Sequence, residues 1–323
     1  MRYRQLGANG PSVSVISFGA APLGGEFGEP PAVDTAVRAV HCAIDLGINF
    51  FDVSPYYGRT LAEIRLGIAL KGKRHNVVLA TKCGRYDVTA FDFSRSRVLA
   101  SIDESLTRLR TDYVDLLQAH DIEFGDERQI VEETIPVMRE IQKRGKARFV
   151  GVSGLPLRLL RRVAEACPVD TILSYCRYNL MVTDLDRLLT PFARERGIGL
   201  INASPLHMGI LTESGPPGWH MAAPAVLEAG SRVVACCRAH GADVTTVALR
   251  FCLDHSYAST TLIGMAAEDH VRRNAAALDY DPPPELMAGI DAIVAPVRDA
   301  IWPWGKPEYD DYETYRFPAV RRN

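Results

Sequence analysis

Eight short apolar runs alternate with helical patterns along this chain, and that alternation constrains the fold more than any other feature. The runs are rich in β-branched and aromatic residues, which is typical of buried strands. They cover residues 13–20, 48–53, 77–82, 113–120, 147–153, 171–176, 198–204 and 260–265. We interpret them as eight strands.

Apolar residues at helical spacing fill the intervals, and a glycine often follows them. The clearest examples are Val33, Val37, Val40 and Ile44 before Gly47, then Val98, Ile102, Leu106 and Leu109, and then Leu185, Leu188, Leu189 and Phe192 before Gly197. Such amphipathic helices return the chain to the next parallel strand. The pattern predicts an α/β fold, a closed (β/α)8 barrel. The competing doubly wound open sheet normally carries a GxGxxG turn after an early strand, and none is present.

Several segments go beyond a minimal barrel. We expect a short N-terminal β-hairpin, and a long Gly/Pro-rich loop over the barrel mouth at residues 211–224. Two helical patterns precede the last strand, and an extra C-terminal helix follows Tyr280 before a possible extended tail at residues 306–323. We interpret residues 1–323 as a single domain, because α/β barrels commonly reach this length.

Composition narrows the functional classes. The net charge is −2, from 37 basic and 39 acidic residues scattered along the chain, so no footprint for nucleic acid or an anionic membrane is visible and a small-molecule partner fits better. The seven cysteines show no metal-ligand spacing and indicate free thiols. No secretory or membrane-spanning stretch is recognisable, so we expect a cytoplasmic protein without a metal site. The sequence does not indicate an oligomeric state.

Polar side chains occur at the ends of three successive strand runs. Asp52, Lys82 and His120 end the runs FFD, LATK and LLQAH, and Tyr57 lies in the loop after the first of them. The carboxyl ends of barrel strands share one rim, where barrel enzymes keep their active sites. Taken singly, the Asp is usually a turn residue, the Lys a surface group and the His structural. Together they predict a catalytic rim.

These residue types suit proton transfer coupled to hydride transfer. Oxidation of an alcohol needs a base for the hydroxyl proton, and Tyr57 can serve if a cation favours its phenolate. Lys82 can supply that charge, and Asp52 can hold the ammonium in place. His120 would hydrogen-bond the substrate oxygen. The neighbouring Cys83 should point to the opposite side of its strand, as a packed thiol.

The motifs D52VSPYY57G, ATK82C and LQAH120D resemble the active-site motifs of the aldo-keto reductases, and the resemblance extends to GKARFVGVSG, ASPLHMGILTE and GMAAEDHVRRN. It implies a barrel oxidoreductase with a nicotinamide cofactor. Within that family the chain most resembles the L-galactose and L-fucose dehydrogenases, through INFFDVSPYYG, INASPLHMGILTESGPPGWH and IWPWG among others. The resemblance implies oxidation of the anomeric C1 hydroxyl of an L-sugar to a lactone.

The resemblance also suggests where the cofactor binds. The pair that grips the nicotinamide amide in the family is Ser153-Gly154 here, the following Gln position is Tyr175, and the stacking aromatic is Ala203. The pyrophosphate loop matches Ser204 to Gly209, with backbone N–H groups as donors. The cofactor residues we expect are Gly19, Ala20, Asp52, Ser153, Tyr175, Ser204, Pro205, Leu206, Gly209, Gly264, Met265, His270, Arg273 and Asn274.

The adenosine end favours NAD, with NADP possible. Members of the family that prefer NADP carry Lys and Arg where this chain has Gly264 and His270, and a 2′-phosphate needs such cations. Arg272 and Arg273 are the two cations that could replace them, and a solvated helix face is the alternative for both.

L-galactose and L-fucose differ only at C6, so the pocket wall there decides between them. Candidates lie at Phe124–Gly125, Trp219–His220 and 302–304, and we assign Tyr57, His120, Phe124 and Trp302 to the substrate. Two other functions stay open. One is an NADPH-linked reductase of aldehydes and ketones with broad specificity. The other is a non-catalytic, nucleotide-sensing subunit, which the intact set of four residues disfavours.

Overall fold

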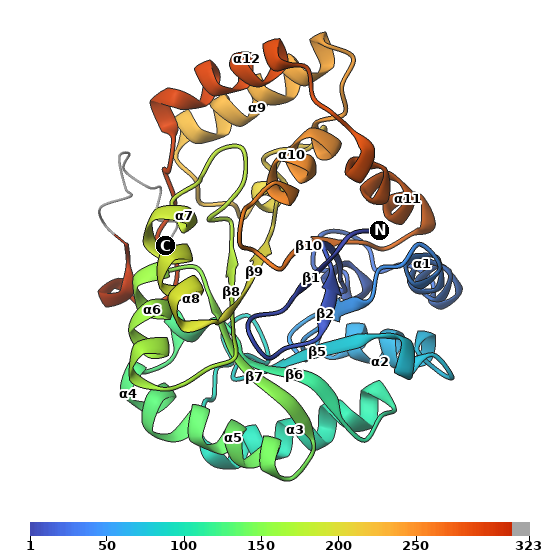
Figure 1. The fold of residues 1–323 in the computed structure, drawn as a ribbon, viewed down its shortest axis with the longest axis vertical. Coiled ribbons are helices and arrows are strands. Elements are labelled where there is room, and N and C mark those ends of the chain that lie inside the picture. The colour runs from blue at the N-terminus through green and yellow to red at the C-terminus, as the bar shows by residue number, and fades with distance from the viewer. Residues whose placement is uncertain (312–323) are drawn as a thin grey trace.

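Eight parallel strands close into a barrel in the computed structural model, which describes residues 1–311 (Figure 1). The order around the barrel is β10-β3-β4-β5-β6-β7-β8-β9. The strands are β3 Ile16–Gly19, β4 Phe50–Asp52, β5 Val78–Cys83, β6 Val114–Ala119, β7 Ala147–Gly154, β8 Thr171–Tyr175, β9 Gly199–Ala203 and β10 Thr260–Gly264. Each of the eight predicted runs contains or overlaps one of them, so the predicted barrel is confirmed.

The first predicted run, residues 13–20, contains parts of two strands and not one. Its beginning belongs to β2 (Ser12–Ser14), which pairs antiparallel with β1 (Tyr3–Gln5) in the expected N-terminal hairpin. The hydroxyl of Ser14 donates to the carbonyl of Ile16 (2.7 Å), and the backbone N–H of Ser14 donates to the Asn49 side chain (2.7 Å). Val15 N donates to the Arg2 carbonyl on the hairpin side (3.0 Å) and the Val15 carbonyl accepts from Thr261 N on the barrel side (2.8 Å), so the chain passes from the hairpin into the barrel at this residue.

Helices surround the barrel and follow the strands as predicted. They are α1 Val33–Asp45, α2 Leu61–Ala69, α3 Arg95–Leu109, α4 Glu127–Gln129, the π-helical η4 Ile130–Thr134, α5 Ile135–Lys143, α6 Leu157–Ala166, α7 Leu185–Leu188, α8 Thr190–Arg196, α9 Pro224–Ala239, α10 Val244–Leu253, α11 Glu268–Ala276 and α12 Pro284–Val294. The short 3-10 turns are η1 Ala21–Gly24, η2 Arg74–Asn76, η3 Ile122–Phe124, η5 His207–Gly209, η6 Ala277–Asp279, η7 Ala295–Val297 and η8 Pro307–Tyr309.

The prediction of one continuous helix around residues 185–192 is wrong, because the structure has two helices there, α7 and α8. The break lies at Leu189, whose φ is −125°. Pro191 has no backbone N–H with which to continue the hydrogen bonding of α7, so a new helix starts there. That helix ends at Gly197 with a φ of 65°, the left-handed ending that the glycine predicted.

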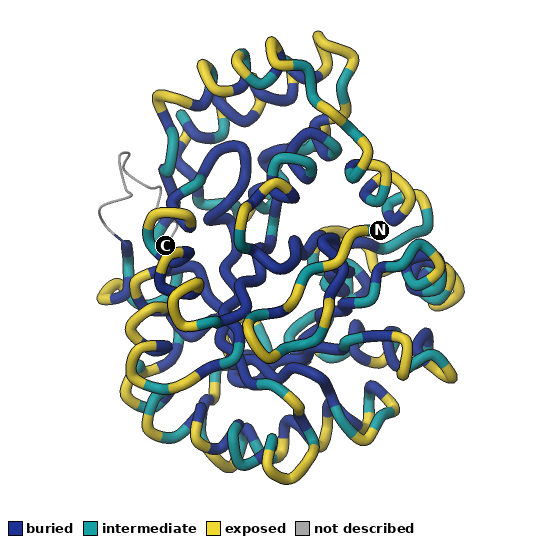
Figure 2. The backbone as a smooth tube through the Cα atoms, in the orientation of Figure 1, coloured by how far each residue is buried: buried dark blue, intermediate teal, exposed yellow. Residues whose placement is uncertain are grey.

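Two apolar layers make the core, and the alternation along each strand separates them. Side chains such as Phe51, Leu79 and Leu117 pack outward against the helices, whereas Phe50, Ala80 and Leu116 belong to the cluster that fills the barrel. Figure 2 shows the strands as buried and the outer helix faces as exposed. Because side chains two residues apart share a face, residues 52, 82 and 118 point into the barrel above this apolar filling.

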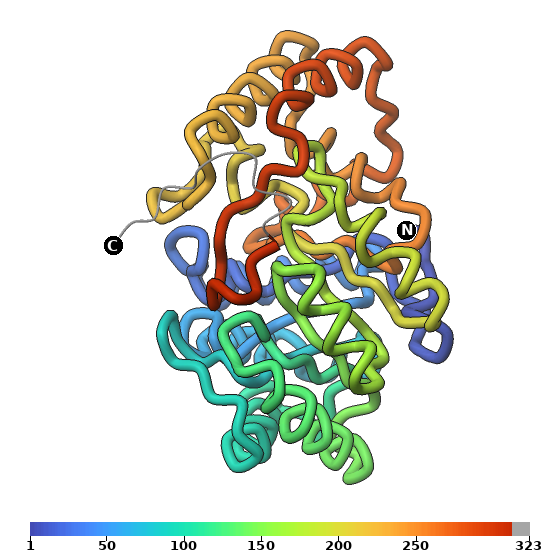
Figure 3. The backbone as a smooth tube through the Cα atoms, turned by 90° about the vertical axis from the view of Figure 1, so that its left-hand side faces the viewer, coloured from blue at the N-terminus to red at the C-terminus, as the bar shows by residue number. Residues whose placement is uncertain are grey.

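The region between β9 and β10 and the C-terminal segment extend the barrel. The predicted pair of helices there is α9 and α10, and α12 lies against α9 (Figure 1). From α12 the chain runs down across one side of the molecule (Figure 3). The Tyr309 hydroxyl accepts a hydrogen bond from Glu127 N (2.9 Å), and an Asp311 carboxylate oxygen accepts one from Leu157 N (2.8 Å).

The beginning of the predicted tail therefore packs on the barrel, and the rest of it, residues 312–323, lies outside the described residues. Among residues 1–311, no helix is both long enough and apolar enough to cross a membrane.

A glycine in α2 gives a test of helix packing. Replacing a helical glycine by alanine ordinarily stabilises a protein by about 1 kcal/mol. At Gly67, however, a Cβ atom would lie 2.3 Å from the backbone oxygen of Arg108 and 2.8 Å from the Cα of Leu109. We expect Gly67→Ala to lower the free energy of unfolding by about 1–3 kcal/mol, because α2 would be pushed away from α3. Urea titration followed by circular dichroism measures the change.

Gly289→Ala in α12 is the matched control. Its Cβ would meet only the Cys236 sulfur, at 3.2 Å. We expect this variant to be neutral or stabilised by up to ~1 kcal/mol. Equal effects of the two substitutions would contradict the close packing of α2 on α3.

Candidate active site

The four residues expected to form a catalytic rim meet at the carboxyl ends of β4, β5 and β6. Lys82 donates a hydrogen bond to Asp52 and another to the carbonyl of Val53 (3.0 Å). Its third bond reaches the hydroxyl of Tyr57, 3.2 Å away. Lys82 and Asp52 are each only 1% exposed, so the ammonium is fully enclosed and all three of its donors have acceptors.

Gln118 completes the support of this group and was not among the predicted residues. Its side-chain amide donates to the second oxygen of Asp52 (2.8 Å), which leaves both oxygens of the carboxylate bonded. Gln118 lies two residues before His120 on the same face of β6. The strand alternation could therefore have identified it as an inward-facing polar residue.

Burial and the neighbouring charges set the protonation of this group. Burial lowers the pKa of Lys82, but the fields of Asp52 and Tyr57 outweigh it and hold the pKa above its usual value. Burial raises the pKa of Tyr57 to about 12, although the Lys82 charge acts in the opposite direction. Lys82 is therefore charged at neutral pH, and Tyr57 carries its proton.

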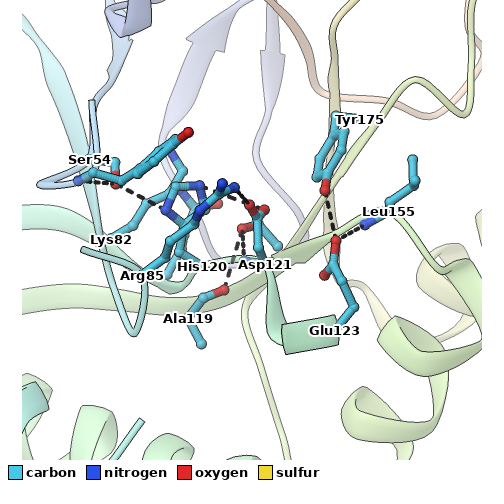
Figure 4. Close-up of polar contacts among 12 residues, drawn as sticks. Ser54, Lys82, Arg85, Ala119, His120, Asp121, Glu123, Leu155 and Tyr175 are labelled. Carbon is cyan, nitrogen blue, oxygen red and sulfur yellow. Dashed lines mark hydrogen bonds and ion pairs between the residues drawn. The ribbon is translucent and has the colours of Figure 1, made fainter. Parts of the chain in front are cut away.

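His120 is neutral, and its tautomer follows from its partner. Burial lowers the pKa of His120 well below its usual value, and the charges of Lys82 and Arg85 add to the effect. The Ser54 hydroxyl accepts from Tyr56 N (3.1 Å) and lies 3.0 Å from His120 Nδ1 (Figure 4). The buried hydroxyl of Ser54 needs an acceptor for its own proton, and it therefore donates to Nδ1. His120 then carries its proton on Nε2.

An ion pair between Arg85 and Asp121 lies beside His120 (Figure 4). The guanidinium stacks over the Tyr56 ring, with its central carbon 3.8 Å from the ring centroid. One Asp121 oxygen lies 3.7 Å from His120 Nε2. No sequence pattern indicated Arg85, which lies in the segment that follows β5. Asp121 comes directly after His120 in the sequence but was not among the predicted site residues.

A further buried carboxylate, Glu123 of η3, lies against the end of β7 (Figure 4). It accepts hydrogen bonds from the hydroxyl of Tyr175 (2.7 Å) and from Leu155 N (3.0 Å). Burial and the charge of Asp121 raise the pKa of Glu123 to about 8. A Cβ at Gly154 would lie 2.5 Å from its other oxygen, so this carboxylate occupies space that a side chain at position 154 would need.

These contacts bear on two of the expected cofactor residues. The hydroxyl of Tyr175 is taken by Glu123, so the ring is the part of Tyr175 that remains for a cofactor. The Ser153 hydroxyl lies 3.4 Å from the Ala119 carbonyl and 3.3 Å from Asp121 N, both long contacts. Ser153 faces the barrel interior, and its hydroxyl can rotate toward a ligand.

The loop after β9 has an unusual backbone that suits a phosphate group. Left-handed φ angles occur at Ser204 (57°), His207 (50°), Met208 (51°) and Gly209 (97°). Left-handed residues in a loop can turn successive N–H groups toward one concave surface, the arrangement that binds anions. The expected residues Pro205 and Leu206 lie within this loop.

Two strand ends meet beside this loop and form its floor. Gly19 and Gly264 are paired in register, Met265 N donates to the Gly19 carbonyl (3.2 Å), and Ala20 N donates to the Asp52 carbonyl (2.9 Å). A Cβ would be crowded at both glycines, by the Ile263 carbonyl at Gly19 (3.0 Å) and by the Pro22 ring at Gly264 (2.9 Å). The expected cofactor residues Gly19, Ala20, Gly264 and Met265 are thus brought together.

Helix α11 carries the remaining expected cofactor residues, with His270 near its start and Arg273 and Asn274 in its last turn. Asn274 is 2% exposed, and its side-chain oxygen has no hydrogen-bond partner in the described part of the chain, as expected of a group that awaits a ligand. Arg272 reaches Glu268 (3.9 Å), Arg273 is exposed, and His270 Nδ1 accepts from Ala266 N (3.4 Å). These features and the loop after β9 fit a nicotinamide dinucleotide.

Aromatic side chains form two groups on the rim. In the first, Phe124 stacks on Phe91 (centroids 4.3 Å apart) and meets Trp304 edge to face (5.6 Å). In the second, Trp302 contacts the rings of His207 (5.1 Å) and His220 (4.5 Å). The expected substrate residues Phe124 and Trp302 therefore belong to separate clusters, which the C-terminal segment links.

The buried Lys82–Asp52 pair predicts an unusual pH dependence of stability. Asp52→Asn should lower the free energy of unfolding by about 3–5 kcal/mol near pH 7, because it leaves an uncompensated buried charge. Without Asp52, burial dominates and the pKa of Lys82 falls below its unfolded value of 10.5. The unfolded chain then binds the extra proton, so the deficit relative to the unmodified protein should shrink as pH rises from 7 toward 10.

Urea unfolding at several pH values measures this deficit. The control is the same substitution in a Lys82→Met background, where no buried amine remains and the pH dependence of the deficit should disappear. A deficit that is constant between pH 7 and 10 would show that Lys82 is not the titrating group.

Comparison with known proteins agrees with this geometry. Residues 15–295 match the model of the Aldo/keto reductase family. The chain is 47% identical over 312 residues to the L-galactose dehydrogenase of Arabidopsis thaliana, covering 94% of this chain and 97% of that protein. It is 27% identical to a D-threo-aldose 1-dehydrogenase from a Pseudomonas species, and this match covers 90% of this chain and 96% of that protein.

A solved structure is similar along nearly its whole length. The holo form of aldo-keto reductase AKR11C1 from Bacillus halodurans superposes with a TM-score of 0.75 at 26% identity, covering 91% of this chain and 96% of that one. The family match spans every barrel strand and the four residues of the rim. The chain therefore belongs to the Aldo/keto reductase family of oxidoreductases.

Proposed function

We propose that this protein oxidises the C1 hydroxyl of an L-sugar, L-galactose or L-fucose, to the lactone, with NAD as the oxidant. The observation that carries the proposal is the enclosed Lys82, which bonds both Asp52 and the Tyr57 hydroxyl. The 47% identity to a protein named L-galactose dehydrogenase supports the choice of substrate.

Tyr57 is the general base in this proposal. The bound nicotinamide coenzyme supplies the acceptor for the hydride that leaves C1. Tyr57 acts as the phenolate: its own proton first passes to water, and its phenolic oxygen then takes the proton of the C1 hydroxyl. Burial raises the pKa of Tyr57 to about 12, and the charge of Lys82 acts against that rise and so favours the phenolate. Asp52 keeps the ammonium charged and Gln118 keeps Asp52 oriented.

His120 positions the substrate. Its Nε2–H is the free donor of the ring, since Nδ1 is bonded to Ser54. A neutral donor can hold the C1 oxygen from the side opposite to Tyr57 without competing for its proton. The two rings meet edge to face with centroids 5.7 Å apart, and in this proposal the hydroxyl of Tyr57 and the Nε2 of His120 bond the same substrate oxygen.

The cofactor would lie across the carboxyl ends of β7 to β10 and β3. We assign the pyrophosphate to the loop of Ser204, Pro205, Leu206 and Gly209, with backbone N–H groups as donors. Gly19, Ala20, Gly264 and Met265 would form the floor. Ser153 and the Tyr175 ring would face the nicotinamide, and Asn274 would contact the adenine through its unpartnered oxygen.

The adenosine end supports NAD over NADP. A side chain at Gly264 would meet the Pro22 ring at 2.9 Å, so the position has no room for a lysine without a shift of η1. The first turn of α11 carries Glu268 and Asp269, whose negative charge disfavours a 2′-phosphate. Arg272 pairs with Glu268, and Arg273 is exposed in the last turn of α11.

The distal end of the sugar would reach the two aromatic groups of the rim. His207 Nδ1 accepts from Asn179 (3.1 Å) and His220 Nδ1 accepts from Ala222 N (3.1 Å), so both rings carry their protons on Nε2. Those two donors and the indole N–H of Trp304 are buried and have no hydrogen-bond partner in the described part of the chain. Such donors favour a substrate with a C6 hydroxyl, L-galactose, over one with a methyl group.

A coenzyme-coupled absorbance assay tests the proposal. We expect reduction of NAD with L-galactose and L-fucose to exceed reduction of NADP with D-sugars at equal concentrations. Tyr57→Phe should lower kcat by about 100- to 10,000-fold, the usual contribution of a general base, and leave the Kd for NAD unchanged.

Faster turnover of NADPH with simple aldehydes or ketones would instead support the broad-specificity reductase. A chain that binds NAD but oxidises no aldose and reduces no aldehyde would support the nucleotide-sensing subunit. Full activity of Tyr57→Phe would remove Tyr57 from the role of base.

A second experiment tests coenzyme preference. His270→Arg places a cation where NADP-preferring members carry one, and a charge-assisted hydrogen bond contributes about 1.5–3 kcal/mol. We expect the ratio of kcat/KM for NADP to that for NAD to rise at least tenfold. Arg272→Gln is the control, and its ratio should not change because Arg272 is paired with Glu268. A ratio that falls in Arg272→Gln and stays constant in His270→Arg would assign the 2′ end to Arg272.

A further inference from the structure

The ion pair of Arg85 and Asp121 has no role in the mechanism above, although it lies directly beside the reacting side chains. Arg85 follows β5, and Asp121 follows His120 at the end of β6. Their exposed fractions are 7% and 4%, so both charges are withdrawn from water. Figure 4 shows Arg85, His120 and Asp121 converging at the carboxyl end of the barrel.

Stability alone does not explain a charged pair at this position. Two buried charges lose their hydration, and an apolar pair of similar volume often stabilises a fold equally well. In addition, Asp121 adopts a left-handed conformation with a φ of 50°, which costs energy for a residue other than glycine. Strain and buried charge that coincide beside an active site indicate a role in binding.

The pair also retains unused hydrogen-bonding capacity. Within residues 1–311 the only side chain that Arg85 bonds is Asp121, and its Nε is buried without a hydrogen-bond partner. The guanidinium is held flat on Tyr56, whose ring lies 6.0 Å from that of His120. A planar donor fixed in this way suits a hydroxyl group, which can accept from Arg85 while it donates to Asp121.

The position of Asp121 beside His120 brings these unused hydrogen-bonding groups next to the reacting oxygen. His120 Nε2 is a donor, and the nearest Asp121 oxygen, an acceptor, lies 3.7 Å from it, which is too far for a hydrogen bond between them. A donor and an acceptor side by side at this separation match two hydroxyls on adjacent carbons. When the C1 oxygen accepts from His120, the hydroxyl on C2 comes to Asp121.

We propose that Arg85 and Asp121 form a specificity-determining pair that binds the C2 hydroxyl of the sugar, so that the enzyme requires a hydroxyl next to the carbon it oxidises. This inference rests on the proposed function. It predicts that a simple aldehyde or alcohol is a poor substrate. Without the C2 hydroxyl, the unused hydrogen-bonding capacity of Arg85 and Asp121 stays unsatisfied when the site is occupied.

The experiment compares the best aldose with its 2-deoxy counterpart. In the unmodified enzyme, loss of the C2 hydroxyl should lower kcat/KM by about 100-fold, the effect expected when a charged group loses its hydrogen-bond partner. Asp121→Asn should lower kcat/KM for the parent sugar by a similar factor. In that variant the further loss on removing the C2 hydroxyl should be clearly smaller, because the charge-assisted hydrogen bond to the carboxylate is already gone and only a neutral amide oxygen remains.

This coupling separates a binding role from a structural one. If Asp121 only supported His120, Asp121→Asn would slow both sugars equally and the 2-deoxy penalty would stay near its full size, which would overturn the proposal. Arg85→Lys, which keeps Asp121 paired, should reduce the penalty only in part. Asp103→Asn, an exposed residue of α3, is the matched control and should leave the penalty unchanged.

If Asp121→Asn fails to fold, the unmodified enzyme alone tests the inference. Equal kcat/KM values for the parent and 2-deoxy sugars would refute it. Oxidation of an aldose with no 2-deoxy penalty would overturn this inference alone and leave the proposed function standing. Failure to oxidise any aldose would overturn the proposed function itself.

Discussion

The contact between Lys82 and Asp52 is the interaction on which the rest of the site depends. An unpaired ammonium inside a barrel would be strongly destabilising, so three strands must hold its partners in fixed register. Asp52 pairs with Ala80 across β4 and β5, and Lys82 pairs with Gln118 across β5 and β6. That register brings the Gln118 amide to the free oxygen of Asp52. The same contacts leave the third N–H donor of Lys82 for Tyr57. The geometry that compensates the buried ammonium therefore also points it at the Tyr57 hydroxyl.

The carboxylates further along the rim depend on segments that are distant in sequence. Glu123 is covered by the C-terminal segment, where Lys306 N donates to its carbonyl (2.9 Å). A Cβ at Gly305 would lie 2.6 Å from the Glu123 side chain, and the φ of this glycine is 83°, so no other residue allows the same close approach without strain. The C-terminal segment, reaching from Trp302 to Asp311, therefore closes the side of the mouth where Glu123 and Tyr175 lie. It shields these groups from water, which is why the pKa of Glu123 is raised to about 8.

The sequence was sufficient to predict the barrel and its four rim residues, because both follow from local rules. Strand runs and their last polar residues are visible in the alternation of side chains, and parallel strands bring those ends together. Gln118 obeys the same rule and could have been found. Arg85 and Glu123 could not, because they follow strand ends, Arg85 in a loop and Glu123 in η3, and their positions depend on tertiary contacts with Tyr56, Tyr175 and Gly305. The break at Leu189 could have been predicted from Pro191. The hydrogen bond between Asp311 and Leu157 could not, because it joins segments that no local pattern connects.

The distribution of polar groups over the rim argues for a substrate that is itself rich in hydroxyls. The reacting oxygen needs only Tyr57 and His120, and an aldehyde or simple alcohol could satisfy both. The rim nevertheless carries further buried groups with unused hydrogen-bonding capacity, namely Arg85 Nε, a Glu123 oxygen and the indole N–H of Trp304. Each such group is destabilising while it lacks a partner, so a site that retains several is adapted to a ligand that can bond them. An apolar carbonyl compound would leave them unpaired and lose affinity for that reason. A sugar presents hydroxyls on adjacent carbons around a compact ring, and can bond several of these groups at once.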